Sequence, residues 1–284
     1  MSTSLEIEKI HGCKNDYLFF DFLTSGQKLP ASFLPAEIAQ KLSDRDSGIG
    51  ADGIILILPS DKADAKMKIF NADGSEAEMC GNGLRGVVRI LDQKLEKAKV
   101  YKIETLAGMR EGQVQEWKPD GSVMVTCDMG RPSFLPSKIP VLFDDVMVLN
   151  EEFEVADKTF LINCVSMGNP HCVIEVENLE TFQVEKYGPL IEKHEAFPSF
   201  TNVEFIEVKG DQIFQRTWER GSKETLACGT GACAVAVVLI MQKRFKKKVL
   251  VHLRGGDLSI QWDGLREVLM SGESVSLGKY SVEV

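Results

Sequence analysis

One short motif occurs twice in this chain of 284 residues, and the repeat constrains the fold more than any other feature. The first copy reads EMCGNG over residues 78–83, and the second reads LACGTG over residues 226–231. Each cysteine is followed by Gly-x-Gly and then by small and apolar residues, a pattern typical of a buried helix that begins just after the cysteine. Because Cys80 and Cys228 are 148 residues apart, the repeat predicts two related halves.

Other residue pairs recur in the same order at nearly the same offset. The offsets are 147, 154 and 150 residues, for Gly74-Ser75 with Gly221-Ser222, Asn15 with Asn169, and Asp52 with Asn202. Any one pair could be chance, but a shared order favours internal duplication. We therefore expect two similar domains, residues 1–130 and 131–274, joined near MGRPSFLP at 129–136. A last strand over 275–284 is expected to return to the first domain.

The predicted elements are mostly strands. Apolar or alternating runs bounded by glycine and proline predict strands at 53–58, 67–70, 123–127, 172–176, 203–208 and 213–218. Two helices are expected, one after Cys80 through residue 91 and one after Cys228 through residue 240. The second is apolar on every side, which predicts deep burial. A buried helix in a strand-rich chain indicates an α+β fold, with sheet wrapped around the helix.

Composition excludes several classes of function. The net charge of −9 argues against nucleic acid or an anionic membrane as the main partner. No apolar run is long enough to span a bilayer, and the N-terminal residues lack the apolar core of a signal peptide, so we expect a cytoplasmic protein. The seven cysteines are an odd, scattered set without CxxC pairs, so neither a disulfide framework nor a metal site is expected.

The CGxG motif suits acid–base chemistry at a carbon next to a carboxylate. A helix N-terminus has unpaired N–H groups and a partial positive charge, so we expect it to lower the pKa of Cys80 and of Cys228. The glycine that follows lets a carboxylate approach the same N–H groups. A lone cysteine before a helix is usually only a small buried hydrophobe, but the matched pair favours a catalytic role.

Two such motifs can invert an amino acid at its α-carbon. One thiolate would remove the α-proton while one thiol returns a proton to the opposite face. The N–H groups would stabilise the enediolate, so no pyridoxal phosphate or other cofactor is expected. Five cysteines lack this setting and are interpreted as structural: Cys13, Cys127, Cys164, Cys172 and Cys233.

The chain resembles the diaminopimelate epimerase family over nearly its whole length. The motifs that carry the resemblance are HGCKND, DSGIGADG, FNADGSEAEMCGNG, SMGNPHC, FTNVEF and ERGSKETLACGTGA, in the family's order. The resemblance implies two pseudo-symmetric α/β domains, each an antiparallel sheet wrapped around a central helix, and a homodimer. It implies the interconversion of LL- and meso-diaminopimelate in lysine and peptidoglycan precursor biosynthesis, without pyridoxal phosphate.

The resemblance also implies roles for individual residues. Cys80 and Cys228 would be the base and the acid, and His171 and Glu219 would tune their pKa values. The substrate would be bound by Asn15, Asn71, Gly81, Asn82, Asn169, Asn202, Glu219, Arg220, Gly229 and Thr230. Arg220 can pair with a distal carboxylate, and Glu219 can accept from a distal ammonium. The asparagines beside turn signals could instead make only Asx-turns, and Glu219-Arg220 could be a surface pair.

Three other functions remain open from the sequence. A proline or hydroxyproline racemase of the same fold would use two cysteines but would not need the asparagines with Glu219 and Arg220. An isomerase of the phenazine-biosynthesis type would lack the cysteine pair. A redox-sensing protein that binds an amino acid could oxidise the two thiols to a disulfide.

Overall fold

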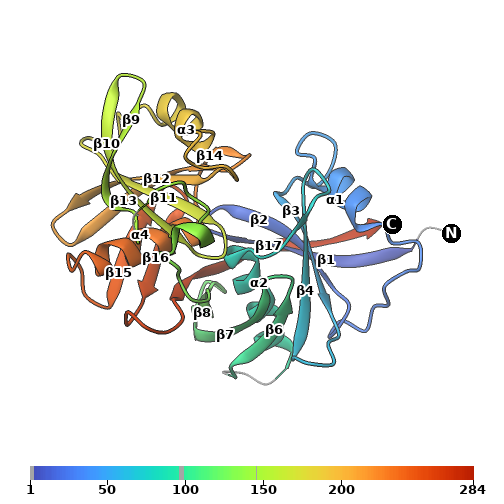
Figure 1. The fold of residues 1–284 in the computed structure, drawn as a ribbon. Coiled ribbons are helices and arrows are strands. Elements are labelled where there is room, and N and C mark those ends of the chain that lie inside the picture. The colour runs from blue at the N-terminus through green and yellow to red at the C-terminus, as the bar shows by residue number, and fades with distance from the viewer. Residues whose placement is uncertain (1–2, 96–98, 145) are drawn as a thin grey trace. The chain divides into compact units, whose positions relative to one another are not determined.

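The computed structural model describes residues 3–95, 99–144 and 146–284. The chain divides into two compact units. Unit 1 comprises residues 1–128 and 271–284, and unit 2 comprises residues 129–270. The described residues form four α-helices and are otherwise dominated by strands (Figure 1).

Unit 1 contains a closed ring of eight strands. Its elements are β1 (Ser4–Gly12), β2 (Asn15–Asp21), α1 (Pro35–Ser43), β3 (Gly53–Leu58), β4 (Ala65–Asn71), β5 (Glu76–Ala77), α2 (Gly81–Lys94), β6 (Tyr101–Thr105), β7 (Gly108–Trp117), β8 (Val123–Asp128) and most of β17 (Leu269–Glu283). Strands β1, β2, β3, β4, β6, β7, β8 and β17 pair in that order, and β17 pairs with both β1 and β8. The chain's last strand is therefore an integral part of unit 1.

Helix α2 packs against several strands of this ring. It contacts β1, β2, β4, β7 and β8, and all of its residues from Gly81 to Asp92 are buried. Close packing requires a glycine in the helix, because a Cβ at Gly86 would lie 2.3 Å from the ring of Phe19. Helix α1 covers a separate apolar cluster that includes Leu18, Phe20 and Phe33.

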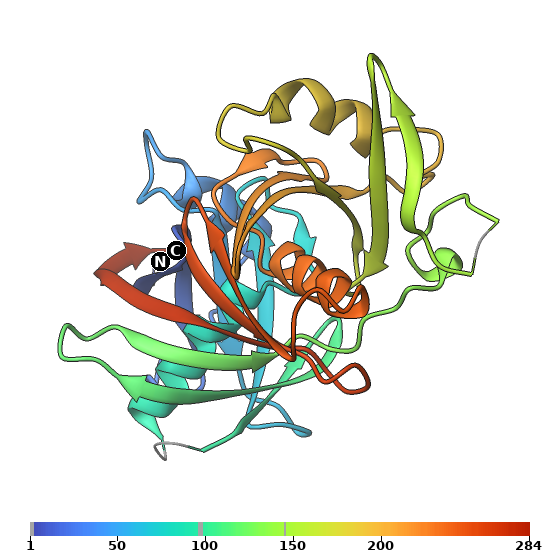
Figure 2. The same cartoon turned by 90° about the vertical axis from the view of Figure 1, so that its left-hand side faces the viewer.

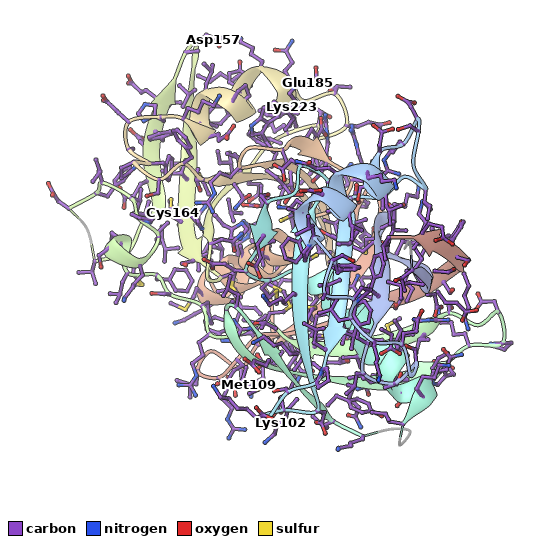
Figure 3. The ribbon with its side chains drawn as sticks, turned by 90° about the vertical axis from the view of Figure 1, so that its right-hand side faces the viewer. Lys102, Met109, Asp157, Cys164, Glu185 and Lys223 are labelled. Atoms are coloured by element: carbon purple, nitrogen blue, oxygen red, sulfur yellow. The ribbon has the colours of Figure 1, made fainter. Side chains whose placement is uncertain are left out.

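Unit 2 contains the remaining elements. They are a 3-10 turn (Pro136–Lys138), β9 (Leu149–Val155), β10 (Lys158–Ser166), β11 (Pro170–Glu175), α3 (Val184–Glu192), β12 (Asn202–Lys209), β13 (Gln212–Glu219), β14 (Lys223–Thr225), α4 (Gly229–Met241), β15 (Lys248–Leu253) and β16 (Gly256–Gln261). Helix α4 contacts β10, β11, β12, β15 and β16 (Figure 2). Cys164 lies within β10, whereas Asp157 lies at the tip of the β9–β10 hairpin (Figure 3).

The two units repeat one order of elements and one set of pairings. Each has an antiparallel pair (β1–β2, β10–β11), a helical crossover to a parallel neighbour (β2–α1–β3, β11–α3–β12) and another antiparallel pair (β3–β4, β12–β13). A short strand and the cysteine-bearing helix then lead to a second parallel pair (β4–β6, β13–β15). In both units the helix with CGxG at its start occupies the same place in the topology.

The expectation of purely antiparallel sheets was wrong. Four strand pairs are parallel: β2–β3, β4–β6, β11–β12 and β13–β15. Each pair is joined by a segment that contains one of the four helices. A crossover of this kind returns the chain in the same direction, so the sheets are mixed.

Candidate active site

Both motif cysteines are the N-cap residues of their helices. Cys80 precedes α2 with φ −139° and ψ 118°, and Cys228 precedes α4 with φ −124° and ψ 112°. The sulfur of Cys80 accepts a hydrogen bond from Gly83 N–H at 3.4 Å, and the sulfur of Cys228 accepts one from Gly231 N–H at 3.4 Å. The prediction that each helix starts directly after its cysteine is confirmed.

Asn15 connects Cys80 to the first turn of α2. Its Oδ1 accepts from Asn82 Nδ2 at 3.1 Å and lies 3.7 Å from the sulfur of Cys80. Its Nδ2 donates to Asp52 at 2.7 Å, which fixes the orientation of the amide. Three of the predicted site residues, Asn15, Cys80 and Asn82, are thus held together in unit 1.

A buried arginine extends this network. Arg85 lies five residues after Cys80 on α2 and is fully buried. Its Nη2 donates to Asn82 Oδ1 at 2.6 Å, and its Nε donates to the carbonyl of Glu273 at 3.2 Å. The hydroxyl of Tyr17, also buried, acts to lower the pKa of Cys80 as a hydrogen-bond donor would. Both groups favour the thiolate, one as a donor and one as a positive charge.

A different chain of hydrogen bonds leads to Cys228 in unit 2. His171 is fully buried, and its two ring nitrogens lie 2.8 Å from Glu204 Oε1 and 3.0 Å from Asn169 Oδ1. Asn169 Nδ2 donates to Thr230 Oγ1 at 3.3 Å, and that hydroxyl lies 3.5 Å from the sulfur of Cys228. Asn169, His171, Thr230 and Cys228, all predicted site residues, therefore belong to one network.

The remaining predicted site residues are less closely connected to the two cysteines by hydrogen bonds. Asn202 is buried and its amide is engaged, accepting from Arg220 N–H at 3.0 Å and donating to the carbonyl of Pro170 at 2.8 Å. Glu219 accepts from Thr225 Oγ1 at 2.5 Å, and its negative charge raises the pKa of Cys228. Asn71 Nδ2 donates to the Ser75 hydroxyl at 3.0 Å, within the turn that follows β4. Gly81 and Gly229 are the first residues of α2 and α4.

The expectation that the helix N-terminus lowers both cysteine pKa values was wrong. Burial raises the pKa of Cys80, although Gly83 N–H, Tyr17 and Arg85 oppose the shift. Burial also raises the pKa of Cys228 well above its ordinary value, and the negative charges of Glu219 and Glu204 raise it further. Desolvation of the thiolate outweighs the helix N-terminus at both positions, and at Cys228 two neighbouring acids act in the same direction as desolvation.

Equivalent positions around the two cysteines differ in charge. The strand registers pair Tyr17 with Gly53 in unit 1 and His171 with Asn202 in unit 2. By the same alignment, Asn71 corresponds to Glu219, Ile55 to Glu204 and Arg85 to Cys233. The bond Asn82–Asn15 corresponds to Thr230–Asn169. The backbone is repeated, but the charged side chains differ. Unit 1 has a cation, Arg85, near Cys80, whereas unit 2 has two acids, Glu204 and Glu219, near Cys228.

Sequence reasoning missed three of these residues. Glu204 is one of two acids, with Glu207, in the otherwise apolar run 203–208, a signal that could have been noticed. Tyr17 stands 154 residues before His171, the same offset that relates Asn15 to Asn169. Arg85 has no comparable signal, because nothing in the sequence shows that an arginine on α2 is fully buried.

The described residues also bear on metal sites and membrane spans. Across residues 3–95, 99–144 and 146–284, no three His, Cys, Asp or Glu side chains are grouped as metal ligands would be. Within the same residues, no helix has the length and apolar character needed to cross a membrane.

Comparison with known proteins identifies close relatives. The family described as "Diaminopimelate epimerase" matches residues 7–135 and 163–277. A diaminopimelate epimerase from Methanococcus maripaludis (strain C6) is 44% identical over 283 residues, covering 99% of this chain and 100% of that protein. One from Desulfitobacterium hafniense (strain DCB-2) is 46% identical over 279 residues and covers 97% of each.

More distant solved structures share the fold. A phenazine biosynthesis protein of the PhzF family from Bacillus anthracis has a TM-score of 0.69 and 18% identity, covering 99% of this chain and 100% of that one. A hydroxyproline epimerase from Agrobacterium vitis has a TM-score of 0.67 and 18% identity, covering 99% and 93%. At this identity the likeness concerns the fold alone.

Proposed function

The chain belongs to the diaminopimelate epimerase family, and we propose that it interconverts LL- and meso-2,6-diaminopimelate with Cys80 and Cys228 as the two bases. The observation that carries the assignment of bases is their matched position, each an N-cap whose sulfur accepts the N–H three residues later. One sulfur takes the α-proton and the other returns a proton to the opposite face of the carbon.

The protonation of the pair follows from the surroundings of each sulfur. Because two acids raise the pKa of Cys228 where Cys80 has a cation nearby, we propose that Cys80 is the first of the pair to lose its proton and that Cys228 keeps its own. After one turnover the roles are exchanged. The energetic cost of a buried thiolate is what makes it a strong base toward a weakly acidic α-proton.

The N-terminal turns of α2 and α4 supply the other half of the chemistry. We assign the backbone of Gly81-Asn82 and of Gly229-Thr230 to the carboxylate at the reacting carbon, where N–H groups stabilise the enediolate. Asn15 and Asn169 hold these turns, as their bonds to Asn82 and Thr230 indicate. Asn71, Asn202, Glu219 and Arg220 are assigned to the distal amino acid group, and His171 and Glu219 to tuning the thiol.

We extend the proposal to the domain architecture, the oligomeric state and the cellular location of the protein. The contacts of α2 and α4 support a central helix wrapped by sheet in each of two pseudo-symmetric domains. We further propose a cytoplasmic homodimer that serves lysine and peptidoglycan precursor synthesis without a cofactor. Size-exclusion chromatography with light scattering tests the dimer, and a monomer mass would contradict it.

Proton exchange tests the activity directly. The reduced protein is incubated with LL-diaminopimelate in D₂O without pyridoxal phosphate, and the α-proton signal is followed by NMR. Loss of that signal with formation of the meso isomer is expected. Proline and glutamate are run in parallel. Exchange on proline alone would reassign the chain to the proline racemases, and no exchange on any substrate would favour a binding or redox-sensing protein.

A further inference from the structure

Glu204 is a fully buried carboxylate in unit 2 that belongs to none of the predicted site residues. It lies on β12 between Val203 and Phe205, which are also fully buried. One oxygen lies 2.8 Å from His171 Nδ1, whereas Oε2 is buried without a hydrogen-bond partner among the described residues. A fully buried carboxylate with an unpaired oxygen costs free energy of folding, and its presence there indicates a functional role.

Glu204 lies directly against the first turn of α4. A Cβ at Gly231 would be 2.7 Å from Glu204 Oε1, so the glycine is what allows the carboxylate to approach the turn that carries Cys228. At the equivalent place in unit 1, a Cβ at Gly83 would meet the methyl group of Ile55 at 2.4 Å. The acid is therefore specific to the Cys228 side of the repeat.

Glu204 is also the end of the hydrogen-bond chain that reaches the sulfur. The chain runs through His171, Asn169 and Thr230 to Cys228, with successive distances of 2.8, 3.0, 3.3 and 3.5 Å. A carboxylate at Nδ1 fixes the orientation of the imidazole ring, and through it the amide of Asn169. Glu204 thus bears on the geometry of the Cys228 side and, together with Glu219, on its charge.

We propose that Glu204 is a positioning residue for the epimerase reaction proposed above: it holds His171 and keeps the proton on Cys228 until the substrate carbanion takes it. In that step the S–H bond breaks, the carbanion's electron pair forms the new C–H bond, and sulfur keeps its electrons as thiolate. The groups that act on Cys228 are Glu204 from β12, Glu219 from β13, and Thr230 with Gly231 N–H from α4, while His171 from β11 acts on the two acids. Nearby negative charge disfavours early loss of the thiol proton.

The test measures how fast each cysteine reacts with iodoacetamide in the intact, reduced protein, resolved by peptide mass spectrometry. Glu204→Gln keeps the shape and removes the charge. Cys228 is expected to react about tenfold faster at neutral pH for each unit by which its pKa falls, while Cys80 keeps its rate. An unchanged or slower reaction at Cys228 would overturn the proposal.

Two controls separate electrostatics from damage to the fold. Asp92→Asn removes another buried carboxylate, which binds Trp117 near the far end of α2, and should leave Cys228 unchanged. The core thiols Cys164, Cys172 and Cys233 should remain unreactive in every folded variant.

If Glu204→Gln does not fold, a variant that adds a negative charge near Cys228 tests the proposal instead. Gln215 Nε2 would lie 3.0 Å from a Cβ at Gly231, so Gln215→Glu adds a charge at the same turn. It should slow the alkylation of Cys228, and an unchanged rate would overturn the proposal. Alkylation needs no substrate, so these outcomes stand apart from the assay for diaminopimelate turnover.

Discussion

The N-terminus of α2 and the N-terminus of α4 share a backbone and differ in charge. Cys80 and Cys228 have the same cap conformation, the same N–H···S bond and the same position in the repeated topology. Around Cys80 lie a tyrosine hydroxyl and a buried arginine, and around Cys228 lie two glutamates and a histidine. We infer that the side chains around the two equivalent sulfurs make Cys80 the easier thiol to deprotonate and make Cys228 hold its proton more firmly.

Removing either sulfur should have the largest effect, because the proposed reaction needs both. Cys80→Ser and Cys228→Ser are each expected to reduce epimerisation by about 10² to 10⁴-fold, the range for loss of a positioned acid or base. The rate of meso product formation measures this. Cys164→Ser, on β10, is the matched control. If only one of the two motif variants loses activity, Cys80 and Cys228 are not equivalent in the reaction.

Removing the buried cation should make the Cys80 side resemble the Cys228 side. Arg85→Gln is expected to raise the pKa of Cys80 and to slow its alkylation at neutral pH about tenfold per unit. Arg89 is the matched control, because it is buried on the same helix but donates to the carbonyls of Gly121 and Ser274. If Arg89→Gln has the same effect on Cys80, Arg85 acts only through folding.

Removing one hydroxyl sharpens the comparison further. Tyr17→Phe removes a hydroxyl that stabilises the Cys80 thiolate, and loss of about 1 kcal/mol corresponds to roughly fivefold less thiolate. The pH dependence of Cys80 alkylation should move to higher pH, while that of Cys228 stays in place. Tyr187→Phe in unit 2 serves as the control for a lost tyrosine hydroxyl. A Cys80 profile that does not move would contradict the role given to Tyr17.

The smallest effect concerns a thiol outside the motif. Burial raises the pKa of Cys127 to about 12, so the folded state retains a proton that the unfolded chain loses near the ordinary pKa of about 9. Its contribution to stability is complete below that pH and is lost as the pH rises toward the folded value. Urea unfolding should show a free energy that falls in this alkaline range, and Cys127→Ala should make the fall less steep. If the unfolding free energy of Cys127→Ala falls with pH as steeply as that of the unmodified protein, the contribution assigned to Cys127 is contradicted.

Much of this could be predicted from sequence, for identifiable reasons. Strands at 53–58, 123–127 and 203–208 and the helices after both cysteines were confirmed, because their apolar patterns are long and clearly bounded. Helices α1 and α3 were missed, since both are short and α3 contains Gly188 and Pro189. The parallel pairs follow from those two helices and from α2 and α4 acting as crossovers, so missing them hid part of the topology.

Seven of the predicted site residues form two networks, one around each cysteine, but their electrostatics could not be read from the sequence. A motif shows that a cysteine starts a helix; it does not show that burial outweighs the helix N-terminus. Arg85, Glu204 and Tyr17 act through positions that only the packed structure brings together. Charge differences between equivalent positions become visible once the strand registers align the two units.

Site-resolved alkylation of the unmodified protein across pH tests the central comparison most directly. Iodoacetamide reacts with the thiolate, so the midpoint of each rate profile reports the pKa of that cysteine. We predict that Cys80 begins to react at lower pH than Cys228, with both midpoints above the ordinary thiol value. Coincident profiles, or a lower midpoint for Cys228, would contradict the account.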